Sequence, residues 1–186
     1  KCTMATFHQP LWYPEDFQKA SSLKGKLEDP SVVKGPGLAK TLGTDPQLTS
    51  TPADWNNEPE MKAYWDVLSQ SGADVVLNGH HHFYGRMKPL DINGMPVAEG
   101  QGIREFISGA GGASMYSFKL NPARADAGFN DTYGILELGL NESGYNWDFK
   151  RADFPENGSG KDSGGVSDTA CRSKTPDAIN LSAYIK

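Results

Sequence analysis

Apolar residues on the two sides of residue 72 follow different patterns, which separate a predicted helix from a predicted strand. The first group recurs at spacings of three or four along the chain: Met61, Tyr64, Trp65 and Leu68. This spacing places them on one face of a helix, Pro59 suits its first turn, and Gly72 is a natural stop. We therefore predict an amphipathic helix from about Glu58 to Ser71. Residues 75–77 then read Val-Val-Leu without polar alternation, which is typical of a strand covered on both faces.

A second strand-like stretch covers residues 2–8 and ends at His8. The helix followed by the buried strand forms an α/β unit, and open α/β sheets bind ligands at the carboxyl ends of their strands. The sequence therefore directs attention to the side chains that follow these two strands.

The second half of the chain has the pattern of antiparallel hairpins. Ile103–Ser108 is strand-like and leads into the glycine turn 109–112, while residues 132–140 lead through another turn into 145–149. In that last segment three aromatic residues alternate with polar ones: Tyr145, Trp147 and Phe149. Such alternation puts one face on a core and the other in water. We expect the hairpins from Ile103 onward to form a second sheet. The glycine turn could cradle a phosphate, but a plain tight turn is favoured because neither a helix nor a lysine follows it.

Two segments show no sustained pattern. Residues 14–53 are polar and form either a functional lid or a solvated insertion without a role. Residues 155–186 contain a stretch rich in Gly, Ser and Asp and are expected to be an irregular tail. A chain of 186 residues can bury one core, so we expect residues 1–186 to belong to a single domain.

Composition excludes some classes of function. The net charge is -5, the isoelectric point is near 5.3 and no Lys/Arg run occurs, which argues against nucleic-acid binding by overall charge. No apolar stretch is long enough to cross a bilayer, so we expect no membrane span.

The two cysteines and the glycosylation motifs bear on location. Cys2 and Cys171 could form a disulfide, or they could be two unrelated thiols. Asn-x-Ser/Thr motifs occur at Asn130, Asn141, Asn157 and Asn180. Together these features favour an extracytoplasmic protein, either secreted or periplasmic.

All four histidines lie at the ends of the two predicted strands. His8 ends the first, and Gly79-His80-His81-His82 follows the second. Imidazole is the commonest metal-binding side chain and a frequent proton carrier, so this clustering predicts a metal site.

With these motifs in view, the chain resembles the carboxyl-terminal half of a calcineurin-like metallophosphoesterase, nearest the secreted purple-acid-phosphatase-like branch. The resemblance rests on ordered motifs: His8-Gln-Pro, then the helix, then Asp74-Val-Val-Leu-Asn-Gly-His80-His-His82-Phe-Tyr84-Gly-Arg86, then Gly102-Ile-Arg-Glu-Phe-Ile-Ser-Gly-Ala-Gly-Gly112, and then Thr132-Tyr-Gly134. It implies an α/β (α+β) fold: half of a four-layer αββα sandwich, with a mixed sheet plus antiparallel hairpins.

The resemblance also implies a site and a reaction. His8 and His80 would bind one metal ion and His82 a second, with Fe, Zn or Mn as the expected metals. Such a two-metal site activates water or hydroxide for in-line attack on a phosphate-ester small molecule. The alternative is a secreted, non-catalytic module that keeps the histidines for metal or partner binding, or in which they are only satisfied polar groups.

Two further residues are candidate catalytic residues. His81 should point away from its neighbours and either support the ligands, contact substrate or be an outward structural histidine. Arg86 could orient ligands or form an ordinary ion pair. Five other side chains near the predicted site could take part in the site or have only a structural or surface role: Tyr84, Trp12, Tyr13, Glu15 and Asp16.

The chain departs from the family pattern in two ways. Gln18 stands where purple acid phosphatases often have a further histidine. The first-half motifs Asp-x-His, the bridging Asp and Gly-Asn-His-Asp/Glu are absent, so we expect the site to need an amino-terminal half of the same domain and the isolated chain to be weakly active or inactive.

Overall fold

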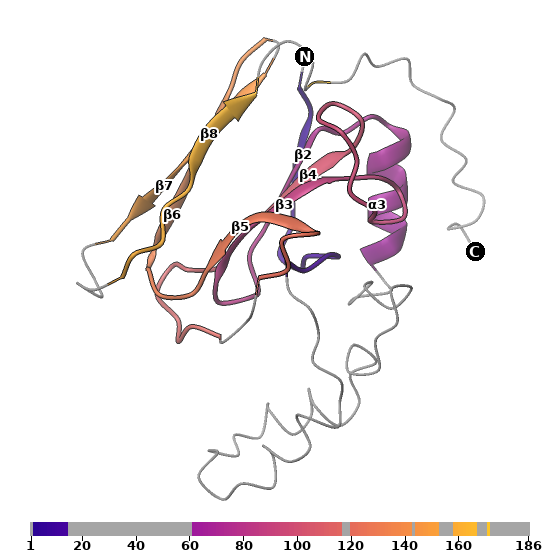
Figure 1. Cartoon of the computed structure of the whole chain (residues 1–186). Helices are drawn as coiled ribbons and strands as arrows, with labels where there is room; N and C mark the ends of the chain where they lie inside the picture. Colours follow the sequence, from indigo (N-terminus) through magenta and orange to yellow (C-terminus); the bar gives the residue numbers. More distant parts are fainter. Residues whose placement is uncertain are drawn as a thin grey trace, which may run out of the picture.

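The computed structural model describes residues 2–14, 61–116, 120–142, 144–152, 158–166 and 171. In chain order the elements are β1 (Met4–Thr6), α3 (Met61–Gln70), β2 (Val75–Asn78), β3 (Tyr84–Leu90), β4 (Ile103–Ser108), β5 (Ala125–Phe129), β6 (Gly134–Leu140), β7 (Tyr145–Arg151) and β8 (Ser163–Val166). Figure 1 shows them as layers, with α3 on one side of a central sheet and β6, β7 and β8 on the other.

The central sheet is mixed, with the strand order β1-β2-β4-β3-β5. β1, β2 and β4 run parallel, whereas β3 is antiparallel to both β4 and β5. Val75 and Val76 on β2 are both fully buried, as predicted for a strand covered on both faces. The α+β arrangement of a mixed sheet plus antiparallel strands is therefore confirmed.

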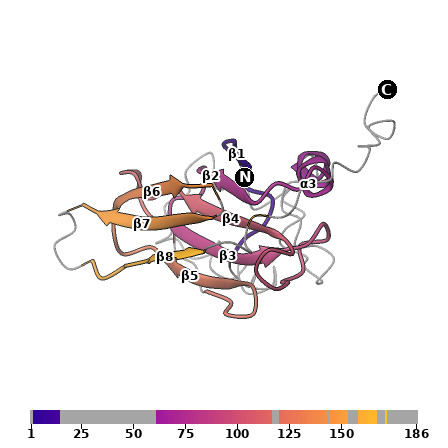
Figure 2. The same ribbon diagram turned by 90° about the horizontal axis from the view of Figure 1, so that it is seen from above.

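Helix α3 lies beside the β1–β2 end of this sheet (Figure 2). Trp65 is its fully buried residue and packs in a cluster with Leu11, Trp12 and Val76. The predicted helix is confirmed over residues 61–70, and residues 58–60 lie outside the described part of the chain. The prediction was wrong for Tyr64, whose side chain is 61% exposed, because the buried stripe of the helix is narrower than the apolar pattern.

The second sheet has the order β6-β7-β8 and is antiparallel throughout. The predicted alternation on β7 is confirmed, since three aromatic side chains are buried toward the central sheet: Tyr145, Trp147 and Phe149. The prediction that Ile103–Ser108 belongs to this sheet is wrong, because the segment forms β4 and pairs with β2 and β3. Its residues 103–107 are all buried, so it belongs in the middle of the layered structure.

Three strands form where no strand was predicted: β3, β5 and β8. β8 lies within residues 155–186, where the composition indicates an irregular tail. Pairing with β7 makes it a strand despite its sequence Ser-Gly-Gly-Val.

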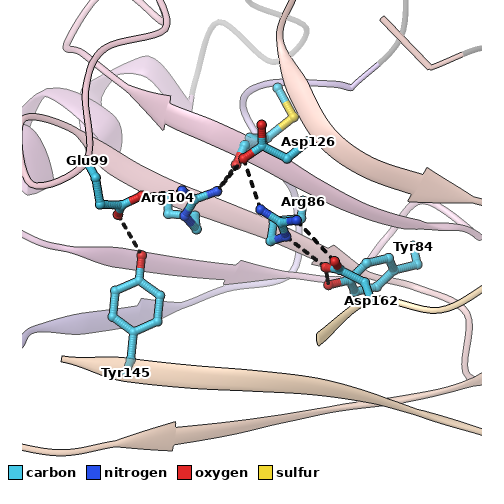
Figure 3. A network of polar contacts seen from close by, with 8 residues as sticks. Tyr84, Arg86, Glu99, Arg104, Asp126, Tyr145 and Asp162 are labelled. Carbon is cyan, nitrogen blue, oxygen red and sulfur yellow. Dashed lines mark hydrogen bonds and ion pairs between the residues drawn. The ribbon is translucent and has the colours of Figure 1, made fainter. Parts of the chain in front are cut away.

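Charged side chains join the two sheets (Figure 3). Arg86 on β3 donates to Asp162, which precedes β8, from Nε at 2.7 Å and from Nη2 at 3.0 Å. Arg86 and Arg104 both donate to Asp126, at 2.9 and 2.8 Å. The guanidinium carbons of both arginines also lie over the Trp147 ring, 4.7 and 5.7 Å from its centre. These contacts fix the second sheet against the first.

Cys2 and Cys171 form a disulfide, which supports the paired reading of the two cysteines. Among the described residues, no helix is long and apolar enough to cross a membrane.

Candidate metal centre

Three of the four histidines line one open hollow of about 430 Å³ at the carboxyl ends of β1 and β2. Its walls are His8, His80, His82, Ser108, Gly109, Gly111, Gly112, Ala113 and Tyr116. The structure thus brings together the three residues expected to bind metal. It leaves His81 and Arg86 outside the set that lines the hollow.

His8 and His80 are in direct contact. Nδ1 of His80 lies 3.1 Å from Nε2 of His8, with the rings nearly perpendicular at 80°. Two imidazole nitrogens that are each about 2.0–2.1 Å from one ion are roughly 2.9–3.4 Å apart for angles between 90° and tetrahedral. The spacing of this pair therefore fits two ligands of a single metal ion.

The backbone at His80 adopts an unusual conformation to reach this position. His80 has φ of 63°, the only positive φ of a non-glycine residue in the described part of the chain. Left-handed conformations of non-glycine residues are costly and cluster at functional sites. Burial, and then the charges of His8 and His82, lower the pKa of His80, which favours the neutral ring that binds metal.

Asn78 ties the two strand ends together. Its side-chain amide donates to the carbonyl of Phe7 at 2.9 Å and to that of Gln9 at 3.2 Å. The amide of Gly79 also donates to the carbonyl of His8, at 3.0 Å. His8 is therefore held beside the loop that carries His80 even though 72 positions separate them.

His82 is oriented through its other ring nitrogen. Nδ1 of His82 lies 2.9 Å from the carbonyl oxygen of Ser114. Because a carbonyl only accepts, Nδ1 carries the proton and Nε2 keeps the lone pair, as in many metal-binding histidines. Tyr116 stacks on the same ring, with centres 4.3 Å apart.

The three histidines do not all offer their nitrogens to one point. Within the described residues, the group of three or more His, Cys, Asp or Glu ligand atoms lying within 4.8 Å of one another is Cys2, Asp74 and Cys171. That group does not fit a metal ion, because its sulfurs are bonded to each other and Asp74 accepts from the Thr3 amide at 2.6 Å. The separation of His82 from the His8–His80 pair is compatible with ligands divided between two ions.

His81 packs against aromatic rings. Its ring centre lies 4.2 Å from that of Tyr13 and 5.6 Å from that of Phe83. Burial, and then the charges of the neighbouring histidines, lower the pKa of His81 to about 3. The His81 ring is therefore neutral and packs among aromatic side chains.

The glycine turn allows the loop to lie close to β4. A Cβ on Gly109 would be 1.7 Å from the carbonyl oxygen of His81, so no larger residue fits. A Cβ on Gly111 would meet nothing within 4 Å. The first glycine is therefore required by close backbone approach, and Gly111 only borders the hollow.

The other candidate residues have different outcomes. Trp12 and Tyr13 are buried and belong to the packing, while Tyr84 is buried and donates to Asp162. Glu15, Asp16 and Gln18 lie outside the described residues. Sequence reasoning missed Asn78 and Ser114 as supports of the histidines. A polar residue ending an apolar strand marks Asn78, but Ser114 acts through its backbone and leaves no sequence signal.

A solved structure with a similar fold is a purple acid phosphatase isolated from yellow lupin (Lupinus luteus) seeds. The match has a TM-score of 0.53 and 18% sequence identity, and covers 89% of this chain and 25% of that chain. No family model and no curated protein matches the sequence. The chain thus has a fold similar to part of this phosphatase and spans about a quarter of the lupin protein.

Proposed function

We propose that the chain is part of a metal-dependent phosphoric ester hydrolase, either a phosphatase or a phosphodiesterase. The observation that carries this proposal is the His8–His80 pair, whose nitrogens are 3.1 Å apart in a hollow that His82 also lines. The fold of a purple acid phosphatase supports it.

In this proposal His8 and His80 bind one ion and His82 a second. Neutral imidazole suits Fe, Zn or Mn. When bound, two such ions lower the pKa of water and neutralise the charge that develops on a phosphate ester.

The remaining residues position these ligands. Asn78 holds the His8 strand end against the His80 loop, and the Ser114 carbonyl keeps the proton on Nδ1 of His82. His81 supports the loop through its packing on Tyr13. Arg86 orients β3, which follows the loop directly, through its pair with Asp162. We assign His81 and Arg86 these orienting roles.

The site needs ligands from elsewhere. A tightly held catalytic ion usually has at least three protein ligands, whereas His8 and His80 supply two and His82 supplies one. No carboxylate occurs among the described residues that line the hollow. We propose that an amino-terminal half of the same domain supplies the missing ligands, in an extracytoplasmic protein for which a disulfide is appropriate.

The test compares metal content and hydrolysis of p-nitrophenyl phosphate and its bis-ester by the 186-residue chain and by the full product of its gene. We expect slow or absent turnover by the former and metal-dependent turnover by the latter. His80→Asn should abolish most activity, because asparagine tolerates positive φ but removes the imidazole. His81→Asn is the matched control and should cost far less. A metal-free gene product that hydrolyses neither ester would contradict the proposal.

The absence of a carboxylate from the described walls also favours a second candidate, a non-catalytic metal-binding module. It predicts a gene product that binds metal through His8 and His80 without hydrolysing either ester.

A further inference from the structure

We propose that Glu105 is a positioning residue for the metal centre: its buried carboxyl group holds the segment that follows His8, and so sets the place of the His8 imidazole. The metal ion in this inference comes from the proposed function, whereas the contacts of Glu105 come from the structure.

Glu105 is a fully buried acid in the middle of β4 that the proposed mechanism does not otherwise use. Burial of a carboxyl group is costly unless its oxygens accept hydrogen bonds. Oε1 of Glu105 accepts from the backbone amide of Leu11 at 3.3 Å. Burial raises the pKa of Glu105, and the hydrogen bond from Leu11, the charge of Arg124 and the Trp12 amide only partly oppose this rise.

Residues 10–14 are all buried, and within the described residues no β-strand pairs with them. Buried backbone amides need acceptors, and unpaired ones destabilise the folded chain. Glu105 supplies the acceptor that a neighbouring strand would give to Leu11. At the end of this segment, the Pro14 carbonyl accepts from Asn121 at 2.7 Å.

Glu105 and Asn78 act from the same face of the central sheet. Val76 pairs with Glu105 and Asn78 pairs with Ile107, so alternation puts all four side chains on one face. It is the α3 face, because Val76 clusters there with Leu11 and Trp12. Two polar anchors therefore hold the segment directly after His8: the Gln9 carbonyl accepts from Asn78, and the Leu11 amide donates to Glu105.

The link between Leu11 and His8 is short and stiff. Only Gln9 and Pro10 intervene, and proline fixes its own φ near -65°. Beyond Leu11, Trp12 is fixed by a perpendicular contact with Trp65 and by Gly94, where a Cβ would be 2.5 Å from the Trp12 ring. The short link leaves little backbone freedom between Leu11 and His8, so we expect a displacement of Leu11 to move His8 against the hydrogen bonds that Asn78 makes.

The experiment measures the ring nitrogens of His8 by NMR, first without metal and then during a titration with zinc, in the 186-residue chain. Glu105→Met removes the acceptor but keeps the length of the side chain. We expect the His8 resonances to shift and zinc affinity to fall about tenfold, the range seen when supports of metal ligands are lost. Glu105→Gln should restore most of both, because its amide oxygen still accepts from Leu11.

Asp74→Leu is the matched control. Asp74 is also buried and also accepts from a backbone amide, but it anchors Thr3 at the other end of β1. We expect it to lower stability without moving the His8 resonances or zinc affinity. If Glu105→Met does not fold, Glu105→Asp withdraws the acceptor by roughly one bond length, about 1.5 Å, and should give a smaller loss of the same kind.

Unchanged His8 resonances in folded Glu105 variants, or equal changes in Asp74→Leu, would overturn the positioning role. If the His8 and His80 resonances of the wild-type chain do not change when zinc is added, the proposed metal site is contradicted. The metal-free spectra would still decide the role of Glu105.

Discussion

Arg86 and Asp162 form a two-pronged ion pair across the two sheets, with both carboxylate oxygens accepting from the guanidinium at 2.7 and 3.0 Å. The side chains are only 13% and 8% exposed. Tyr84 donates to the same carboxylate at 2.6 Å, and burial followed by this hydrogen bond raises the pKa of its hydroxyl. One aspartate thus holds the segment before β8 to β3.

We expect Asp162→Ala to lower the free energy of unfolding by about 3 kcal/mol, because it removes one of the two carboxylate partners of a largely buried guanidinium and the acceptor of a buried hydroxyl. Urea denaturation measures the loss. The control is Asp148→Ala, whose Lys150 partner is half exposed and should be worth less than about 1 kcal/mol. If both variants lose the same free energy of unfolding, the Arg86–Asp162 pair contributes no more to stability than an exposed ion pair.

His80→Gly should separate stability from metal binding. Glycine adopts positive φ without strain but gains more freedom in the unfolded chain, so the two effects offset to within about 1 kcal/mol. We expect little change in thermal stability together with loss of zinc binding. A large destabilisation would mean that the His80 ring, through its contact with His8, holds the loop together.

Gly109→Ala should be severely destabilising, by at least about 3 kcal/mol, because its Cβ would overlap the His81 carbonyl oxygen. Gly111→Ala, two positions along, meets no atom within 4 Å and has no positive φ, so we expect a change below about 0.5 kcal/mol. Chemical denaturation of both variants checks the pair. Similar stabilities would show that the loop lies farther from β4.

Stability should depend on pH through Glu105. Burial raises the pKa of Glu105 to about 8, against the hydrogen bond from Leu11 and the charge of Arg124. Between its unfolded pKa near 4.3 and about 8, the folded chain keeps a proton that the unfolded chain has lost. The free energy of unfolding should therefore fall as pH rises through this window, by up to about 1.4 kcal/mol per unit from this group. Urea titrations at pH 5, 6 and 7 should show a shallower fall for Glu105→Gln; identical slopes would exclude this contribution.

The elements that the sequence predicts are those whose own residues encode their burial. β2 is an apolar run and β7 alternates aromatic with polar residues, and both occur as expected. β8 has no such signal, because Gly164 and Gly165 have low strand propensity. It forms by pairing with β7, and Gly164 leaves room for the Trp147 ring, from which a Cβ would be 2.5 Å away. Glycine is needed here because of a side chain on the partner strand β7, which the local sequence of β8 does not reveal.

The same division holds at the site. The histidines are visible in the sequence because imidazoles are few and share two strand ends. The sequence does not show which sheet contains β4, because a strand buried on both faces has no pattern that identifies its neighbouring strands. The support that β4 gives to His8 through Glu105 therefore depends on tertiary structure.

The Cys2–Cys171 disulfide provides a second covalent connection between the segment with His8 and the segment with His80, in addition to the chain between residues 14 and 61. A protease cut at any one peptide bond there gives two pieces, one with Cys2 and His8 and the other with Cys171 and His80. The bridge keeps them in one molecule, and the parallel pairing of β1 with β2 keeps His8 next to His80. A nicked chain should run as one band on a gel without reductant and as two with it. It should also retain zinc until it is reduced and dissociated.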